Sequence, residues 1–185
     1  VDYLFIPNTK EIYKYRDKKF KLKNNDKVLC AKFRKGHFEG VLDVMDRLTK
    51  IIKPKVIFMG EKDFQQIFLV KKFLLKRHKT RIFSCKTIRD KNFLALSSRN
   101  YLLNKVQLKK AGLINKYCFE LKRKVKKNNY NFLQIKKKEI EKKFNIKMDY
   151  LELRSEKNLS LVIKNSKNRL FIAYYLNKIR LIDNF

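Results

Sequence analysis

The sequence predicts a mixed α/β protein in which part of a parallel sheet is followed by a small α+β domain with an antiparallel sheet. In the first half, short apolar runs alternate with helical patterns, which is typical of parallel strands joined by crossover helices. In the second half, two helical patterns precede several strand-like runs separated by turn residues. We place the boundary between residues 87 and 88, which gives domains of residues 1–87 and 88–185.

Five segments of the first half alternate between strand and helix. The strand-like segments are continuous apolar runs, and the helical ones repeat apolar residues every three or four positions. In chain order they are Tyr3–Ile6, Glu39–Ile52, Val56–Met59, Asp63–Lys76 and Ile82–Cys85. This alternation predicts part of a Rossmann-like parallel-sheet domain, in which ligands bind beyond the carboxyl ends of the strands.

The second half begins with an irregular stretch that extends to Asn104. Helical periodicity then covers Lys105–Lys127 and Phe132–Phe144. Clusters of Asn, Ser and Lys separate the four strands expected after them, which are Met148–Arg154, Leu159–Ile163, Arg169–Leu176 and Ile179–Ile182. Helices followed by strands with short turns predict an α+β domain with an antiparallel sheet.

The chain is strongly basic, with 48 Lys and Arg residues against 17 Asp and Glu and a net charge of +31. Because 44% of its residues are hydrophobic and 13% are aromatic, it is not a disordered basic tail. Such charge is typical of a nucleic-acid-binding module, since lysines that neutralise phosphates release counterions. The lysines are scattered rather than gathered in a stripe, however, and outnumber arginines. We therefore favour a residue-usage bias and keep the nucleic-acid-binding module as the alternative.

Neither membrane insertion nor secretion is expected. No apolar run approaches the roughly 18 residues of a membrane span, and the first residues lack the features of a signal peptide. The three cysteines, Cys30, Cys85 and Cys118, are odd in number and form no Cys-x-x-Cys pair, which favours a reducing compartment. The sequence starts without Met in an apolar run, so we expect residues upstream of Val1.

The segment Gly60–Gln66 follows an apolar strand and opens a helix. Gly60 permits close approach of a ligand to the backbone, the helix start offers N–H groups to anions, and Lys62 adds a mobile positive charge. Together these features suit a nucleotide. The alternative is a reciprocal capping box between Asp63 and Gln66, and spacing alone leaves both interpretations open.

A second polar segment, Leu94–Asn100, changes abruptly from apolar residues to hydroxyls and a guanidinium. Arg99 can donate two parallel hydrogen bonds to phosphate oxygens, and Ser97 or Ser98 can donate another. A loop that caps a helix explains the same residues, and without context that explanation is favoured.

The histidines do not predict a metal site or a nucleophilic triad. His37 lies between Gly36 and Gly40 just before a helical pattern, and His78 is the other histidine. Neither a His-x-x-His nor a His-Cys arrangement exists, so no metal ligands are assigned. We expect His37 to be a structural or orienting residue.

Taken in order, four motifs resemble the pantothenate synthetase (pantoate–beta-alanine ligase) family, and the match spans nearly the whole chain. The motifs are Gly36–Val41, Gly60–Gln66, Leu94–Asn100 and Arg180–Asn184. The resemblance favours the nucleotide interpretations and implies a two-step reaction. Pantoate first attacks ATP to give pantoyl adenylate and pyrophosphate, and the amine of beta-alanine then displaces AMP to give pantothenate.

The resemblance also implies roles for individual residues. Lys62, Arg99 and Ser97 are expected to be catalytic. The residues expected to bind ATP are Gly60, Glu61, Lys62, Asp63, Ile88, Leu96, Ser97, Ser98 and Arg99, with Lys62 at the phosphates, Asp63 near the ribose and the Ile88 backbone at the adenine. The residues expected to contact pantoate are Gln66, Val41, Val44 and Met45.

The resemblance further implies Mg²⁺ as a companion of ATP, a homodimer, a cytoplasmic location and a place in the biosynthesis of coenzyme A. Three departures from the family's pattern stand out. The family's His-x-Gly-His motif is absent, so we expect this chain alone to be inactive and N-terminally incomplete. Phe93 stands where a small residue is usual, and Leu96 where Met is common.

Overall fold

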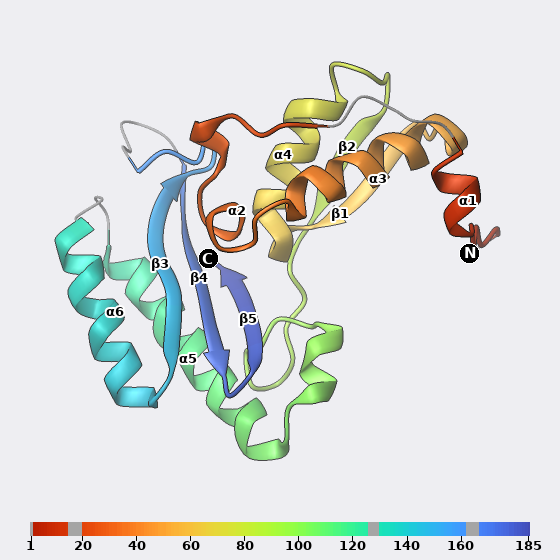
Figure 1. Cartoon of the computed structure of the whole chain (residues 1–185). Helices are drawn as coiled ribbons and strands as arrows, with labels where there is room; N and C mark the ends of the chain where they lie inside the picture. Colours follow the sequence, from red (N-terminus) through yellow and green to blue (C-terminus); the bar gives the residue numbers. More distant parts are fainter. Residues whose placement is uncertain (1, 15–19, 126–129, 162–166) are drawn as a thin grey trace. The chain divides into compact units, whose positions relative to one another are not determined.

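The computed structural model describes residues 2–14, 20–125, 130–161 and 167–185 (Figure 1). The chain divides into two compact units, the first made of Val1–Met59 and Gln65–Ser84 and the second of Gly60–Phe64 and Cys85–Phe185. The short Gly60–Phe64 segment thus groups with the second unit, although its sequence neighbours belong to the first. The domain boundary between residues 87 and 88 stays a prediction, because compact grouping does not establish which segments fold independently.

The first unit has the strand–helix–strand order expected of a parallel sheet. Strands β1 and β2 pair in one parallel sheet, and α3 and α4 supply buried apolar residues such as Leu42 and Leu69. Its elements are α1 (Thr9–Ile12), η1 (Asn24–Asp26), α2 (Cys30–Phe33), α3 (His37–Ile52), β1 (Val56–Gly60), α4 (Phe64–Leu74) and β2 (Arg81–Cys85). The two helices and two strands predicted between residues 39 and 85 are therefore confirmed.

The predicted strand at Tyr3–Ile6 is wrong. These residues form no regular element, and the side chains of Leu4 and Ile6 are each 79% exposed. A strand requires a neighbour with which it forms hydrogen bonds, and within the described residues Tyr3–Ile6 joins neither edge of the β1-β2 sheet. Apolar composition alone was the basis of the prediction, and it does not supply that neighbour.

The second unit is an antiparallel sheet, in the order β3-β4-β5, packed against two helices (Figure 1). Helix α6 packs on β3 and α5 packs on β4, and the core between them includes Ile114, Ile140 and Ile172, each 0% exposed. The elements are η2 (Glu61–Asp63), η3 (Ser98–Leu102), α5 (Lys105–Lys124), α6 (Tyr130–Phe144), β3 (Lys147–Ser155), β4 (Asn168–Leu176) and β5 (Ile179–Asn184). The expected α/β class with a Rossmann-like part and an antiparallel α+β part is confirmed.

The strand expected at Leu159–Ile163 is also wrong where the structure describes it. Leu159–Leu161 are irregular, and residues 162–163 lie outside the described residues. Leu159 has a positive φ of 57°, which a strand does not accommodate, and its carbonyl accepts a hydrogen bond from Arg154 Nη1 at 2.5 Å. Helix α5 ends at Lys124, earlier than predicted, and the last predicted residues, 126–127, also lie outside the described residues.

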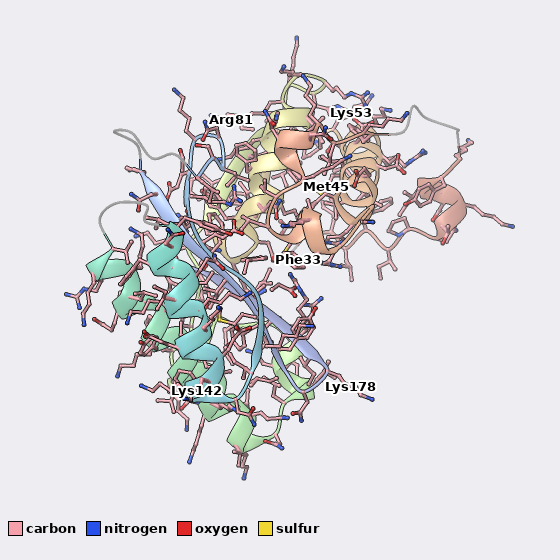
Figure 2. The ribbon with its side chains drawn as sticks, turned by 60° about the vertical axis from the view of Figure 1, so that its left-hand side comes forward. Phe33, Met45, Lys53, Arg81, Lys142 and Lys178 are labelled. Atoms are coloured by element: carbon pink, nitrogen blue, oxygen red, sulfur yellow. The ribbon has the colours of Figure 1, made fainter. Side chains whose placement is uncertain are left out.

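Basic side chains are spread over both units rather than gathered on one element. In Figure 2 nitrogen-tipped side chains project from many elements, with Lys53 and Arg81 in the first unit and Lys142 and Lys178 in the second. This distribution agrees with a residue-usage bias. Among the described helices, none combines the length and the apolar character that crossing a membrane requires.

Candidate active site

The first predicted ATP segment lies where β1 ends. Gly60 is the last residue of the strand, and Glu61–Asp63 turn at once into the short helix η2. The Nδ2 group of Asn184 holds this turn by donating to the carbonyl oxygens of Glu61 and Lys62, at 3.0 and 2.8 Å. The described hydrogen bonds include no capping box at Asp63, whose carboxylate lies 3.8 Å from Lys62 Nζ. The capping alternative is therefore not supported.

The side chains of this segment differ in what they can offer a ligand. Lys62 keeps 20% of its side chain exposed and Asp63 keeps 51%, so both are accessible. Glu61 instead faces Arg169, with Oε2 3.7 Å from Nη1, and the same guanidinium lies over the Phe64 ring at 4.4 Å. Glu61 thus fixes the segment, whereas Lys62 and Asp63 are accessible to a nucleotide.

The second predicted segment brings Ile88 and Leu96 side by side. An antiparallel bridge joins Arg89 to Ala95, and the Leu96 N–H donates to the Ile88 carbonyl at 3.0 Å. Although both side chains are apolar, Ile88 is 70% exposed and Leu96 is 54% exposed. Two residues expected on the adenine side therefore form one exposed apolar surface.

The hydroxyl and guanidinium groups follow directly in η3. Ser97 caps this helix, because its Oγ accepts from the Arg99 N–H at 3.3 Å, so the capping interpretation holds for Ser97. Its hydroxyl proton can still be donated, since capping uses only the oxygen as an acceptor. Arg99 Nη1 donates to the Arg180 carbonyl at 2.8 Å, which fixes the guanidinium and leaves further N–H groups for an anion. Ser98 is exposed.

Both segments pack against the same strand. Helix η2, which carries Lys62, and helix η3, which carries Arg99, each contact β5 within the second unit. The positive charge of Lys62 also lies close enough to Asp183 on β5 to oppose part of the rise that burial causes in the pKa of that carboxyl. Lys62 and Arg99, which are 37 positions apart in the sequence, thus lie on two short helices that pack against the same strand.

Asp183 is the buried centre of this arrangement, with 2% of its surface exposed. Arg89 donates to both of its carboxylate oxygens, at 2.6 and 3.0 Å, Asn115 Nδ2 donates at 2.7 Å, and the Asn184 N–H donates at 2.8 Å. Burial raises the pKa of the Asp183 carboxyl, and the hydrogen bond and charge of Arg89 oppose that rise. Because every one of these partners donates, the arrangement accommodates the ionised carboxylate.

Sequence reasoning did not assign roles to Arg89, Asp183 and Asn184. The signal that could have found them was the Arg180–Asn184 motif, which was noted as part of the resemblance but has no chemistry of its own. Two of its partners, Arg89 and Glu61, lie 94 and 123 positions away along the chain, beyond the reach of local spacing.

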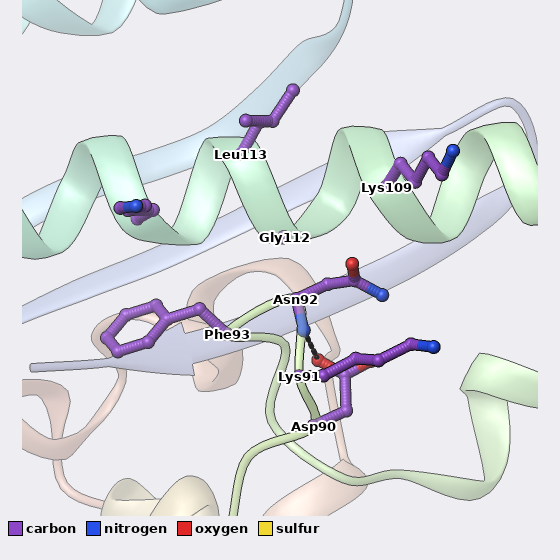
Figure 3. Close-up of a pocket in the computed structure, with 8 residues that line it drawn as sticks. Asp90, Lys91, Asn92, Phe93, Lys109, Gly112 and Leu113 are labelled. Carbon is purple, nitrogen blue, oxygen red and sulfur yellow. Dashed lines mark hydrogen bonds between the residues drawn. The ribbon is translucent and has the colours of Figure 1, made fainter.

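The loop that leads to Leu96 is fixed against α5, beside a cavity of about 470 Å³ (Figure 3). Asp90 Oδ1 accepts from the backbone N–H groups of Asn92 and Leu94, at 2.9 and 2.8 Å. Gly112 of α5 permits the close approach, because a Cβ added there would lie 2.1 Å from the Asn92 carbonyl oxygen. None of the predicted ATP residues lines this cavity, so its relevance is the rigidity of the loop.

Phe93 in this loop has a φ of 70°, a left-handed conformation that favours glycine, which gives a physical reason for a small residue at this position. Its ring stacks on Phe185 at 6.3 Å and lies 5.1 Å from Phe119. The Arg89 guanidinium lies over the rings of Phe93 and Phe185, at 4.7 and 4.8 Å. The aromatic contacts offset the backbone strain.

The residues predicted to contact pantoate lie in the first unit. Val41, Val44 and Met45 are half-buried on α3, and their spacing of three and four places them on one face. On α4 the structure distinguishes two adjacent glutamines. Gln65 is buried, accepting from the Cys30 N–H at 3.0 Å and donating to the Val28 carbonyl at 2.7 Å, whereas Gln66 is half-buried. Gln65 is thus structural, a role that spacing did not predict.

Within the described residues, no group of three or more His, Cys, Asp or Glu side chains is placed to hold a metal ion. His37 begins α3, and its ring lies 5.0 Å from that of Phe38. The described residues therefore do not fit a resident metal centre, and none of them is assigned as a metal ligand.

A family model for pantoate-beta-alanine ligase matches residues 1–185, the whole chain. The chain belongs to the pantoate–beta-alanine ligase family. The pantothenate synthetase of Azobacteroides pseudotrichonymphae is 35% identical over 98% of this chain and 67% of its own length. That of Clostridium botulinum strain Langeland is 36% identical over all of this chain and 68% of its own length. The chain thus spans about two-thirds of the length of these relatives.

Solved structures of the ligase family agree with this membership. The Thermus thermophilus pantothenate synthetase superimposes with a TM-score of 0.87 and 27% identity, over all of this chain and 69% of that one. The Francisella tularensis ligase, solved in complex with beta-gamma ATP and beta-alanine, gives a TM-score of 0.72 and 32% identity over 95% of this chain and 61% of that one. These comparisons do not support the nucleic-acid-binding alternative.

Proposed function

We propose that this chain takes part in the ATP-dependent condensation of pantoate with beta-alanine, through a pantoyl-adenylate intermediate. Membership of the ligase family supports the reaction, and the Francisella relative in complex with beta-gamma ATP and beta-alanine supports its substrates. The observation in this chain that carries the proposal is that both predicted ATP segments pack against β5. We propose on this basis that Lys62 and Arg99 bind the same nucleotide.

The reaction defines what these residues do. In the first step a carboxylate oxygen of pantoate forms a bond to the α-phosphorus of ATP, and the bond from that phosphorus to pyrophosphate breaks. In the second step the amine of beta-alanine forms a bond to the acyl carbon, AMP leaves with the electron pair of the broken C–O bond, and the amine releases a proton to solvent. Negative charge gathers on the phosphates in the first step, where prepositioned donors stabilise it.

Lys62 and Arg99 supply the positive charge in our proposal, and Ser97 donates its hydroxyl proton to a phosphate oxygen. The backbone of Gly60 and Glu61 admits the nucleotide closely, Asp63 accepts from the ribose, and Ser98 adds a second hydroxyl. The exposed surface of Ile88 and Leu96 receives the adenine. Arg99 is the best prepared of these donors, because the Arg180 carbonyl already fixes its guanidinium.

Pantoate is proposed to bind Gln66 through its amide and the α3 face of Val41, Val44 and Met45 through its methyl groups. The half-buried state of all four side chains supports this assignment. We treat Mg²⁺ as part of the substrate, bound by the phosphates of ATP, because phosphates with one or two carboxylates are the usual ligands of this ion. Asp63, with its exposed carboxylate, is the residue best suited to approach it.

Substitution of the two cations tests the proposal. Lys62→Ala and Arg99→Ala are compared with Lys178→Ala, which removes a lysine from the exposed turn between β4 and β5. Each is made in a fusion that supplies the family's His-x-Gly-His segment upstream of Val1. We expect pantoate-dependent pyrophosphate release to fall by about 10²-fold to 10³-fold in the first two variants and to stay unchanged in the third. Unchanged release in both would contradict the assigned roles.

The fusion also tests the reaction as a whole. It is expected to release AMP from ATP only when both pantoate and beta-alanine are supplied, and AMP release without pantoate would refute the proposal. The chain of 185 residues alone has no His-x-Gly-His motif, so we expect it to bind ATP without completing the condensation. Turnover by the unfused chain would contradict that expectation.

The remaining expectations from the family resemblance are proposals of the same kind. We propose a homodimer, which light scattering after size-exclusion chromatography tests directly by mass. A cytoplasmic location and a role in coenzyme A biosynthesis are tested by cell fractionation and by complementation of a pantothenate-requiring strain with the fusion. Growth of that strain without pantothenate is the expected result.

A further inference from the structure

We infer that Asn184 is a positioning residue that fixes the backbone on both sides of Lys62, and that β5 through Asp183 and Asn184 holds both ATP segments in register. The catalytic consequence of this inference rests on the proposed function. Its structural part concerns only contacts within the second unit and stands independently of any ligand.

The side-chain amide of Asn184 is fully used. Both protons of Nδ2 are donated to consecutive carbonyls, those of Glu61 at 3.0 Å and Lys62 at 2.8 Å, while Oδ1 accepts from Arg169 Nη1 at 2.7 Å. Rotating the amide by half a turn would set its oxygen against two carbonyls and its NH₂ against a guanidinium. The orientation is therefore dictated by the partners, and the residue is 3% exposed.

The backbone of Asn184 is held as firmly as its side chain. Its N–H donates to Asp183 Oδ1 at 2.8 Å, its carbonyl accepts from Arg89 Nη2 at 3.4 Å, and it pairs with Phe171 across the β4–β5 ladder. Arg169, which fixes the Asn184 amide, also reaches Glu61. Strand β5 thus determines where the turn that contains Lys62 lies.

The same strand holds the second segment. Asp183 binds the Arg89 guanidinium through two hydrogen bonds, and Arg89 adjoins Ile88 and donates to the Phe93 carbonyl at 3.2 Å. At the other end of β5 the Arg180 carbonyl accepts from Arg99. Residues of one strand therefore set the positions of both predicted phosphate-binding cations.

Positioning of this kind matters for the proposed reaction. Displacement of a catalytic group by about 1 Å costs on the order of 10²-fold in rate, even when the substitution lies away from the chemistry. Without Asn184 the carbonyls on either side of Lys62 lose their donors, and the turn is free to shift. Asn184 itself needs no contact with ATP for this effect.

The test compares Asn184→Asp and Asn184→Ala with the same changes at Asn168, at the start of β4 in the same sheet. Asn184→Asp keeps the shape of the side chain and the contact with Arg169 but removes both donated hydrogen bonds. Asn184→Ala removes them without adding charge. Asn168 accepts from Lys122 Nζ at 2.6 Å, an interaction that Asn168→Asp retains, so this variant controls for the added negative charge.

Hydrogen exchange of the ligand-free chain is the first measurement. In both Asn184 variants we expect amides of residues 60–66 to exchange about tenfold faster, because two stabilising hydrogen bonds are lost, while β3 and β4 stay protected. The Asn168 variants are expected to match the wild-type chain in residues 60–66. A residue with a general structural role would instead lower the thermal midpoint without this local change. Unchanged exchange of residues 60–66 in a folded Asn184→Asp variant would overturn the inference.

Binding of ATP to the same chains is the second measurement, with about tenfold weaker binding expected for both Asn184 variants. Faster exchange of residues 60–66 combined with wild-type ATP affinity would overturn the claim that the positioning serves the nucleotide. Failure of the wild-type chain to bind ATP would count against the proposed function, whereas the exchange measurement would still decide whether Asn184 fixes the turn.

Discussion

Gly112 and Gly40 are both helical glycines, and the structure predicts opposite effects of replacing them with alanine. In α5, a Cβ at Gly112 would lie 2.1 Å from the Asn92 carbonyl oxygen and 2.9 Å from the Asn92 Cβ. In α3, a Cβ at Gly40 would meet nothing within 4 Å. Alanine favours a helix over glycine by about 1 kcal/mol at either position. If Gly112→Ala lowers the free energy of unfolding while Gly40→Ala raises it, the contact between Gly112 and the loop is the cause.

The cost at Gly112 follows from what holds the loop. The Asn92 carbonyl oxygen must move by about 1.3 Å to reach ordinary contact distance from the added Cβ, and the two hydrogen bonds to Asp90 oppose that movement. Overpacking costs about 1–3 kcal/mol, and weakening one of the hydrogen bonds costs about 1 kcal/mol more. After subtracting the gain in helix propensity, we expect Gly112→Ala to destabilise the second unit by about 2 kcal/mol. Gly40→Ala should stabilise the first unit by up to about 1 kcal/mol.

Scanning calorimetry and urea unfolding of both variants check this prediction. A loss of about 2 kcal/mol lowers the melting temperature by about 4–8 °C for a chain of this size. Hydrogen exchange should increase in the loop of residues 90–96 of the Gly112→Ala variant and nowhere in the Gly40→Ala variant. The reasoning would be refuted by a Gly112→Ala protein that melts at or above the wild-type temperature.

Two further predictions concern the first unit. Burial raises the pKa of the Asp46 carboxyl, but hydrogen bonds from His78 and Lys50 and the charges of Lys50 and Arg77 outweigh it, so the native pKa is lowered from 3.8. The stability that Asp46 contributes is therefore complete above the unfolded pKa and is lost as pH falls through the native one. We expect Asp46→Asn to lower the free energy of unfolding at pH 7 by about 2 kcal/mol, as measured by urea unfolding. The variant should also lose less stability than the wild-type protein when the pH is lowered. An equal acid-induced loss in both proteins would contradict this. Gln65→Ala should lower the melting temperature, as measured by scanning calorimetry. Gln66→Ala should instead weaken pantoate binding, as measured by titration calorimetry, and leave the melting temperature unchanged; a lower melting temperature for Gln66→Ala with normal pantoate binding would contradict this.

The elements that sequence predicted correctly are those whose apolar pattern is local. Helix α3 followed from the spacing of its apolar residues, and β1 from an uninterrupted run that ends at Gly60. Tyr3–Ile6 is as apolar as β1 and is not a strand, because hydrogen bonding to a neighbour decides that outcome. Leu159 is irregular rather than part of a strand for a similar reason, since its carbonyl accepts a hydrogen bond from Arg154. A local sequence pattern shows neither whether Tyr3–Ile6 has a neighbouring strand nor that Arg154 donates to Leu159.

The candidate site shows the same difference between features set by local sequence and features set by contacts between distant residues. Lys62, Ser97 and Arg99 were predicted because each lies in a short motif whose residue types suit a phosphate, and because the family resemblance favoured that interpretation over capping. Asp183 and Asn184 were noted without a role, because their function depends on residues far away in the sequence that meet only after folding. The sequence thus predicts candidate ligand-binding groups, whereas the residues that fix their positions became evident only from the folded structure.

The grouping of Gly60–Phe64 with Cys85–Phe185 has a practical consequence for protein engineering. Cutting the gene between residues 84 and 85 would yield two fragments, neither of which contains a whole compact unit. The segment Gly60–Phe64 would be expressed apart from Asn184, which donates hydrogen bonds to it. A split reporter or a domain transplant would have to carry this pentapeptide along with the C-terminal fragment, for example as a copy of residues 60–64 joined to it by a linker.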